Sequence, residues 1–171
     1  MTAVDPGLFG SLDPPRLAGG RCANCGTVSF PPQTGCARCA GTELARVALA
    51  DRGTLWTWTV QALEPKAPYR APGGGFAPYG VGYVDLGDVI VEARLLGDPA
   101  GFEIGMPMRL ALLPLWPGPD GSPVVSYAFR PADDGTAHDG TAHDGTAHDG
   151  TADDGTADGN AADGNTGGER G

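Results

Sequence analysis

The sequence predicts a mainly β protein in which a small cysteine-rich ribbon precedes a β-barrel and a tail without regular structure. Three observations support this prediction. The four cysteines of the chain all lie within residues 22–39, as two Cys-x-x-Cys pairs. Residues 43–131 consist largely of short strand-like segments separated by glycine and proline turns. At Asp134 a pentapeptide repeat begins that contains almost no apolar side chain larger than alanine.

The two cysteine pairs, Cys22/Cys25 and Cys36/Cys39, have the spacing of a tetrahedral zinc site. Each pair forms one tight turn, and together the turns supply the four thiolates of a structural Zn²⁺ centre. Disulfide pairing is the alternative, but a cytosolic compartment keeps thiols reduced. Because four sulfurs close the coordination sphere, the expected zinc stabilises the fold and offers no open position to a substrate.

The residues around the cysteine pairs indicate a ribbon of rubredoxin-like type. Gly26 follows the first pair, where glycine can adopt a positive φ and let backbone N–H groups point at sulfur. Ala40 occupies the same place after the second pair, in a looser version of that turn. Between the pairs, residues 27–30 are β-prone and end at a Pro-Pro dipeptide. The predicted order is therefore a cysteine turn, a short strand and a second cysteine turn.

Six strand-like segments after the ribbon predict a small all-β barrel. Their alternating or apolar character and the tight turns between them favour such a barrel, and we find no convincing amphipathic helix. Trp56 and Trp58 share a strand face by the period of two, so we expect at least one of them in the core. Residues 86–89 have the composition of a tight hairpin turn. The six segments are 44–50, 54–63, 79–86, 89–96, 106–115 and 124–129.

The acidity of the chain comes almost entirely from its C-terminal segment. Residues 132–171 carry ten acidic side chains against Arg170, so residues 1–131 account for only −1 of the total net charge of −10. A segment so poor in large apolar side chains cannot bury enough surface to order itself, and we expect it to be disordered. The nearly neutral remainder gives no indication of a preferred charged partner.

We expect four consecutive regions in the chain. They are a short N-terminal extension at 1–20 with room for at most one helical turn, a zinc ribbon at 21–42, a barrel at 43–131 and the repeat tail at 132–171. We see no secretory signal and no apolar run of about 18 residues, so the expected location is the cytoplasm, without a membrane partner.

At this point the motifs resemble a known family, the zinc-ribbon/OB-fold family of acyl-CoA-associated accessory proteins. The likeness covers residues 21–131, with its motifs in the same order. The sequence segments that carry it are Phe30-Pro31-Pro32, Gly53-Thr54-Leu55-Trp56-Thr57-Trp58-Thr59-Val60, Pro78-Tyr79-Gly80-Val81-Gly82-Tyr83-Val84-Asp85-Leu86, Ile104-Gly105-Met106-Pro107-Met108 and Tyr127-Ala128-Phe129-Arg130-Pro131.

The resemblance implies an OB-fold barrel and the role of an accessory subunit. Members of the family accompany a thiolase-like or hydratase-like catalytic subunit that handles acyl-CoA in lipid, steroid or polyketide metabolism. The barrel would then help to bind the acyl-CoA or bridge enzymes, and the ribbon would stabilise it. The complex would carry out thiolase, aldolase, acyltransferase or hydratase chemistry, with one structural Zn²⁺ in each accessory chain.

The distribution of histidine argues against catalysis by this chain on its own. His138, His143 and His148 all lie in the repeat tail, so residues 1–131 contain none. With the cysteines assigned to zinc, neither a thiolase-type Cys/His site nor a Ser-His-Asp triad can form in the barrel. Five-residue spacing in an unfolded tail provides no preorganised metal geometry, so we expect any metal binding there to be weak.

Two sets of residues are candidates for holding acyl-CoA. Guanidinium and ammonium groups match phosphate, although exposed charges more often only solvate a surface. Aromatic side chains could line a groove, or equally the barrel interior. The phosphate candidates are Arg38, Arg46, Lys66 and Arg70, and the groove candidates are Trp58, Phe76 and Tyr79.

Binding of single-stranded nucleic acid is the alternative function, because ribbons and OB barrels often bind such strands. The tryptophans and Tyr83 could stack on bases. A barrel near neutrality followed by an acidic tail would repel a phosphate chain, however, so this function is disfavoured. A dyad of carboxylates among Asp85, Asp88 and Glu92 is a third possibility, although these acids flank a hairpin and are more simply explained by solvation of its edge.

Overall fold

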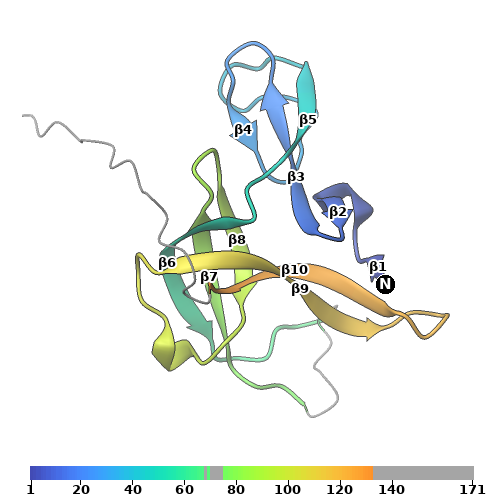
Figure 1. Ribbon diagram of the computed structural model, residues 1–171, viewed down its shortest axis with the longest axis vertical. Coiled ribbons are helices and arrows are strands. Elements are labelled where there is room, and N and C mark those ends of the chain that lie inside the picture. Colours follow the sequence, from blue (N-terminus) through green and yellow to red (C-terminus); the bar gives the residue numbers. More distant parts are fainter. Residues whose placement is uncertain (68, 70–74, 133–171) are drawn as a thin grey trace, which may run out of the picture. The chain divides into compact units, whose positions relative to one another are not determined.

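The computed structural model describes residues 1–67, 69 and 75–132, coloured along the chain in Figure 1. This part of the chain forms ten strands and two 3-10 helices, so the expectation of a mainly β fold is confirmed. None of the helices in the described residues is long and apolar enough to cross a membrane. The repeat tail, for which we expect disorder, lies outside the described residues except for Ala132.

The ribbon is built on one central strand, β3 (Pro15–Cys22). On either side it pairs antiparallel with β2 (Phe9–Leu12), β4 (Val28–Ser29) and β5 (Leu44–Ala48). Figure 1 shows these four strands gathered apart from the barrel strands, with β5 leading into β6.

Residues 1–20 contain one helical turn, in keeping with the expectation of at most one, but the strands in this segment were not expected. The helix η1 (Pro6–Leu8) is that turn, but β2 and most of β3 also lie in this segment. The glycines of β3 resemble chain breakers in the sequence, yet they serve close packing. A Cβ on Gly19 would lie 2.5 Å from Leu49 Cδ2 and 3.1 Å from the Ser29 carbonyl oxygen.

Residues 44–50 were expected in the barrel, and this expectation is wrong. The strand exists as β5, but it pairs with β3 from Ala18↔Ala48 to Cys22↔Leu44. The alternating pattern identifies a strand without identifying its neighbour. Because β5 follows directly after the second cysteine turn, the nearest free edge belongs to β3.

Five strands close the barrel: β6 (Arg52–Gln61), β7 (Tyr79–Asp85), β8 (Ile90–Leu95), β9 (Pro107–Pro117) and β10 (Pro123–Pro131). They follow the order β6-β7-β8-β10-β9, and β9 pairs again with β6. The β8–β10 pair is parallel and the other barrel pairs are antiparallel. This is the five-stranded arrangement of an OB-fold, as the resemblance implied. The short strand β1 (Thr2–Ala3) adds in parallel to β10, and the helix η2 (Pro99–Gly101) connects β8 to β9.

The barrel interior is apolar throughout. Leu55, Val84, Met108 and Phe129 are fully buried, and no polar or charged side chain is buried among the described residues. Gly82 faces the interior and lets strands approach closely, because a Cβ there would lie 2.8 Å from the Thr57 carbonyl oxygen. The interior therefore provides stability and no reactive group.

A β-bulge in β6 separates the two neighbouring tryptophans. Leu55 pairs with Val84 and Thr57 pairs with Tyr83, so Trp56 is the additional residue. Trp56 is 57% exposed, whereas Trp58 packs against the core with its ring 5.6 Å from that of Phe102. Trp58 is thus half-buried against the core rather than part of its fully buried set, and the two tryptophans do not share a strand face.

Candidate metal centre and barrel groove

The four cysteines form one cluster in the ribbon. All four Sγ atoms lie within 4.8 Å of one another. Cys22 Sγ is 3.6 Å from Cys39 Sγ, and Cys25 Sγ is likewise 3.6 Å from Cys36 Sγ. All four are free thiols, which disfavours the disulfide alternative. In a zinc tetrahedron with Zn–S bonds of about 2.3 Å, neighbouring sulfurs are about 3.8 Å apart, so the cluster fits Zn²⁺.

The two cysteine turns have the same backbone geometry. Gly26 N–H donates to the Cys22 carbonyl, and Ala40 N–H donates to the Cys36 carbonyl, both at 2.9 Å. Gly26 has φ of 72° and Ala40 has φ of 57°. Glycine adopts this left-handed conformation without strain, whereas alanine does so at a cost. The second cysteine turn is therefore strained at Ala40, whereas the first turn is unstrained at Gly26.

Neighbouring polar groups favour the thiolate form of two of the cysteines. The Thr27 hydroxyl lies 3.2 Å from Cys25 Sγ, and its hydrogen bond to the thiolate helps to lower the pKa of Cys25 to about 6. Asn24 Nδ2 donates to Cys39 Sγ at 3.4 Å, which lowers the pKa of that thiol. Thiolate is the form that ligates zinc. Zinc bound here would have four sulfur ligands and no vacant position, so it would hold the two turns together.

The carboxylates considered as a catalytic dyad have separate structural partners. Asp88 forms a salt bridge with Arg21 at 2.6 Å. Asp85 Oδ1 accepts the Gly87 N–H at 2.8 Å in the predicted hairpin turn. Glu92 accepts the Tyr83 hydroxyl at 3.0 Å. The structure therefore gives no support to a dyad at this hairpin.

The predicted phosphate-binding residues lie on different elements. Arg38 is exposed in the second cysteine turn, and Lys66 is exposed in the loop after β6. Arg46 on β5 donates to the carbonyl oxygens of Gly7 at 3.0 Å and Phe9 at 2.8 Å, which gives it a structural role near the N-terminus. Arg70 lies outside the described residues. Phosphate binding by these residues stays a prediction.

Two of the three predicted groove aromatics lie together. The Phe76 ring is 6.2 Å from that of Tyr79. Tyr79 lines a groove of about 460 Å³ on the outer face of the barrel. Gly80, Gly82 and Val84 are the buried residues of β7, so Tyr79 does not face the interior. Trp58 packs toward Phe102 instead.

Sequence reasoning missed Arg94, which lines the same groove as Tyr79. Its guanidinium carbon lies 4.0 Å from the centroid of the Tyr79 ring. The signal was present in β8, where Glu92 and Arg94 alternate with the buried Val91, Ala93 and Leu95. Charged side chains at every second position of a strand indicate that this face of the strand points away from the core.

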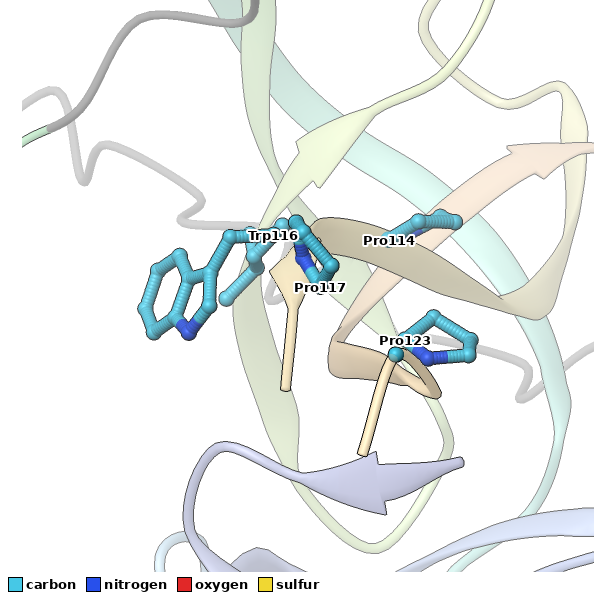
Figure 2. A pocket seen from close by; sticks show the side chains of 6 residues that line it. Pro114, Trp116, Pro117 and Pro123 are labelled. Atoms are coloured by element: carbon cyan, nitrogen blue, oxygen red, sulfur yellow. The ribbon is translucent and has the colours of Figure 1, made fainter. Parts of the chain in front are cut away.

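A smaller hollow of about 240 Å³ lies at the far end of the β9–β10 hairpin. Figure 2 shows the Trp116 ring extending away from Pro114 and Pro123. The lining has no ionisable side chain, so this hollow offers packing surface without acid–base chemistry. It is lined by Pro114, Leu115, Trp116, Pro117, Gly121 and Pro123.

The cysteine cluster and the closed barrel together define a class of protein, a rubredoxin-like zinc ribbon joined to an OB-fold barrel. Comparison with known families agrees. Residues 9–45 match the "ChsH2, rubredoxin-like zinc ribbon domain", and residues 46–113 match the "ChsH2, C-terminal OB-fold domain".

Relatives extend the match over both parts of the chain. Benzoylsuccinyl-CoA thiolase subunit BbsA of Thauera aromatica is 32% identical over 117 residues, which cover 68% of this chain and 76% of the relative. A DUF35 domain-containing scaffold protein of Methanocaldococcus jannaschii is 30% identical over 125 residues, covering 69% and 83%. A solved structure described as "Ltp2-ChsH2(DUF35) aldolase" has 30% identity and a TM-score of 0.53, covering 68% of this chain and 84% of that one. The chain therefore belongs to the ChsH2/DUF35 family.

Proposed function

We propose that this chain is a non-catalytic subunit of a thiolase-like enzyme that acts on acyl-CoA. The observation that carries the proposal is the match, across ribbon and barrel together, to a thiolase subunit that is 32% identical. The similarity to the Ltp2-ChsH2(DUF35) aldolase supports the same role, because its name also pairs a DUF35 chain with a second protein. These relatives favour a thiolase-like partner over a hydratase-like one.

The reacting groups would come from the partner. Residues 1–131 contain no histidine, and the cysteines are gathered in one cluster suited to zinc. Acyl transfer needs a nucleophile, a base and donors to an oxyanion. This chain would instead contribute a docking surface and part of the binding site for acyl-CoA. We further propose one Zn²⁺ per chain, and a tail that begins at residue 132.

Co-purification tests the subunit role. An affinity-tagged full-length chain is recovered from the native lysate, and zinc is quantified in the same sample. The expected result is a thiolase-like protein in stoichiometric amount, with one zinc per chain. A Cys36→Ser variant serves as the control for dependence on the ribbon, because it removes one ligand and leaves the barrel sequence intact.

Two other results would overturn the proposal. Recovery of oligonucleotide in place of a protein partner, with affinity that falls steeply with salt, would favour nucleic-acid binding. Thioester turnover by the purified chain would make it an enzyme in its own right. Contact with acyl-CoA is tested separately, by titrating acetyl-CoA into the chain alone and into the reconstituted complex.

A further inference from the structure

The outer face of the barrel sheet carries a group of large apolar side chains that are exposed. Trp56 is 57% exposed, Tyr83 and Ile90 are each 41% exposed, and Ile104 is 70% exposed. Single exposed apolar side chains are common on protein surfaces, whereas a contiguous group of them marks an interaction site. We call these four residues the aromatic patch.

Two neighbouring strand pairs bring three of the four side chains together. The Trp56 ring meets the Tyr83 ring edge to face across the β6–β7 pair, with centroids 6.3 Å apart. Tyr83 lies opposite Glu92 on β8, so Ile90 is its diagonal neighbour on the same face. The patch is therefore continuous from β6 to β8.

The fourth residue lies on the other side of β6. The Leu55 carbonyl accepts the Gly105 N–H at 2.8 Å, and the Leu55 N–H donates to the Met106 carbonyl at 2.9 Å. These bonds place the chain at Ile104 beside β6 at the position of Trp56. Because the bulge in β6 turns Trp56 outward, the tryptophan occupies the middle of the patch.

A carboxylate without a basic partner borders the aromatic rings. Glu92 accepts the Tyr83 hydroxyl at 3.0 Å, and this hydrogen bond together with the charge of Glu92 raises the pKa of Tyr83. Arg94, two residues further along β8, stacks on Tyr79 instead. The salt bridges within the described residues are Arg16–Asp51 and Arg21–Asp88. Glu92 is thus available to a positive charge from another molecule.

The shape of the patch favours a protein over a small molecule. Trp56, Tyr83 and Ile90 line neither the groove beside Tyr79 nor the hollow at the β9–β10 hairpin. Small molecules bind in concave sites, whereas protein interfaces centre on exposed Trp and Tyr side chains and frequently pair them with Arg. A nucleic-acid strand fits poorly, because its phosphates would meet the Glu92 carboxylate.

We propose that the aromatic patch docks the thiolase-like subunit, and that an arginine of that subunit binds at Glu92. This inference rests on the proposed function. A guanidinium is planar, so it can stack on an exposed aromatic ring while its N–H groups donate to the carboxylate. Apolar side chains around that arginine pack against Trp56 and Ile104. The charge on Glu92 sets the orientation of the partner, and burial of Trp56 supplies most of the affinity.

Truncation of the central tryptophan tests the patch. The thiolase-like subunit that co-purifies with the native full-length chain is isolated and titrated into each zinc-loaded variant by calorimetry. Trp56→Ala should weaken binding about 30-fold, the effect of losing an interface residue that carries much of the affinity. Trp56→Phe keeps an aromatic ring and should lose much less. Trp116→Ala, the same substitution on the β9–β10 hairpin, is the control and should bind as the native chain does.

Neutralisation of the carboxylate tests the charge. Glu92→Gln should weaken binding about fivefold, because the arginine loses a charge-assisted hydrogen bond. Added salt should weaken binding of the native chain more than that of Glu92→Gln. Glu43→Gln is the control, since Glu43 is exposed on the ribbon side of the chain, and its affinity and salt dependence should be native. Equal salt dependence of Glu92→Gln and the native chain would overturn the role of the charge.

Hydroxyl-radical labelling of the native complex needs no variant. Binding of the thiolase-like subunit should reduce oxidation of Trp56 and Tyr83 and leave Trp116 unchanged. Unchanged oxidation of Trp56 in the complex would overturn the proposal even if Trp56→Ala fails to fold. Native affinity of a folded Trp56→Ala chain would also overturn it, as would a finding that Trp56→Ala abolishes only self-association of this chain.

Failure of the patch and failure of the subunit role are distinguishable. If the native chain recovers no thiolase-like protein, the proposed function fails, and docking at the patch fails with it. If the native chain recovers that protein and Trp56→Ala recovers it equally well, the subunit role stands and only the assignment to the aromatic patch is wrong.

Discussion

The ribbon and the barrel are both β structures, but different forces stabilise them. The ribbon has a small share of the core, with Phe9, Leu17 and Val28 as its buried large side chains, and it gathers four thiolates. The barrel closes five strands around an apolar interior that contains Leu55 and Phe129. The ribbon is therefore expected to depend on a metal, whereas the barrel depends on burial of apolar surface.

The two parts are nevertheless in contact. Tyr127 of β10 meets Phe30 and Phe9 edge to face, with ring centroids 5.3 Å and 6.4 Å apart. Aromatic pairs of this kind contribute about 0.5–1.5 kcal/mol beyond the burial of their area. We therefore expect each part to stabilise the other modestly, and four perturbations measure how separate the two are.

Removal of zinc should have the largest effect. Structural zinc binding contributes about 10–16 kcal/mol in small zinc domains, so chelation or Cys36→Ser should unfold the ribbon. The barrel should stay folded with a lower Tm, because Tyr127 loses its ribbon contacts. All three tryptophans of the chain lie in the barrel sequence, at positions 56, 58 and 116, so their fluorescence reports the barrel and amide spectra report the ribbon. Simultaneous loss of both signals would contradict two separately stabilised parts.

Leu55→Ala should destabilise the barrel by about 2–5 kcal/mol, because it leaves a cavity beside β7 in a closed interior. Urea unfolding followed by tryptophan fluorescence measures the change. Val60→Ala on the same strand is the matched control, since Val60 is 39% exposed and should change stability by less than about 0.5 kcal/mol. Zinc content should be native in both variants.

Gly82→Ala should cost about 1–3 kcal/mol, because the new methyl group overpacks the barrel interior. Its Cβ would lie 2.8 Å from the Thr57 carbonyl oxygen and 2.9 Å from Leu95 Cδ1. Gly101→Ala is the control, as no atom lies within 4 Å of its added Cβ. Equal stability of the two variants in thermal unfolding would mean that β6 and β7 are not as close as described.

Ala40→Gly should have the smallest effect and the opposite sign. It relieves the left-handed strain of the second cysteine turn and should stabilise the zinc-bound ribbon by about 0.5–1 kcal/mol after the greater chain entropy of glycine is subtracted. Competition with a chelator should show a few-fold higher zinc affinity. The reciprocal Gly26→Ala should lower the affinity by a similar factor, and the barrel Tm should stay the same in both.

The features that could be predicted from the sequence are those that a local pattern encodes. The spacing of Cys22, Cys25, Cys36 and Cys39 predicted their cluster, because each pair needs only one turn. The five barrel strands followed from alternating runs between turn residues, and the turn at 86–89 from its Leu-Gly-Asp-Val composition. The resemblance then supplied the OB-fold, which alternation alone cannot give.

The features that were missed depend on contacts between residues that are distant in the sequence. β3 was overlooked because Gly19 serves packing against Leu49 rather than breaking the chain. The partner of β5 is the strand with the nearest free edge, β3. The bulge at Trp56 shifts the two-residue alternation of side chains within β6. Arg94 was missed because its surroundings come from four strands and a loop. None of these is visible in a window of a few residues.

The arrangement of β10 has a consequence for biosynthesis. β10 is the last strand in the described residues and pairs with β9, β8 and β1, so the barrel cannot close until residue 131 has been made. The ribbon is complete about eighty residues earlier, at the end of β5, because its sheet and cysteines lie within residues 9–48. A nascent chain can therefore acquire its metal while β6–β9 are still an open sheet with exposed edges, the stage at which aggregation is a hazard. Zinc supply would therefore govern folding of the ribbon, which is synthesised first. Completion of β10 would govern folding of the barrel.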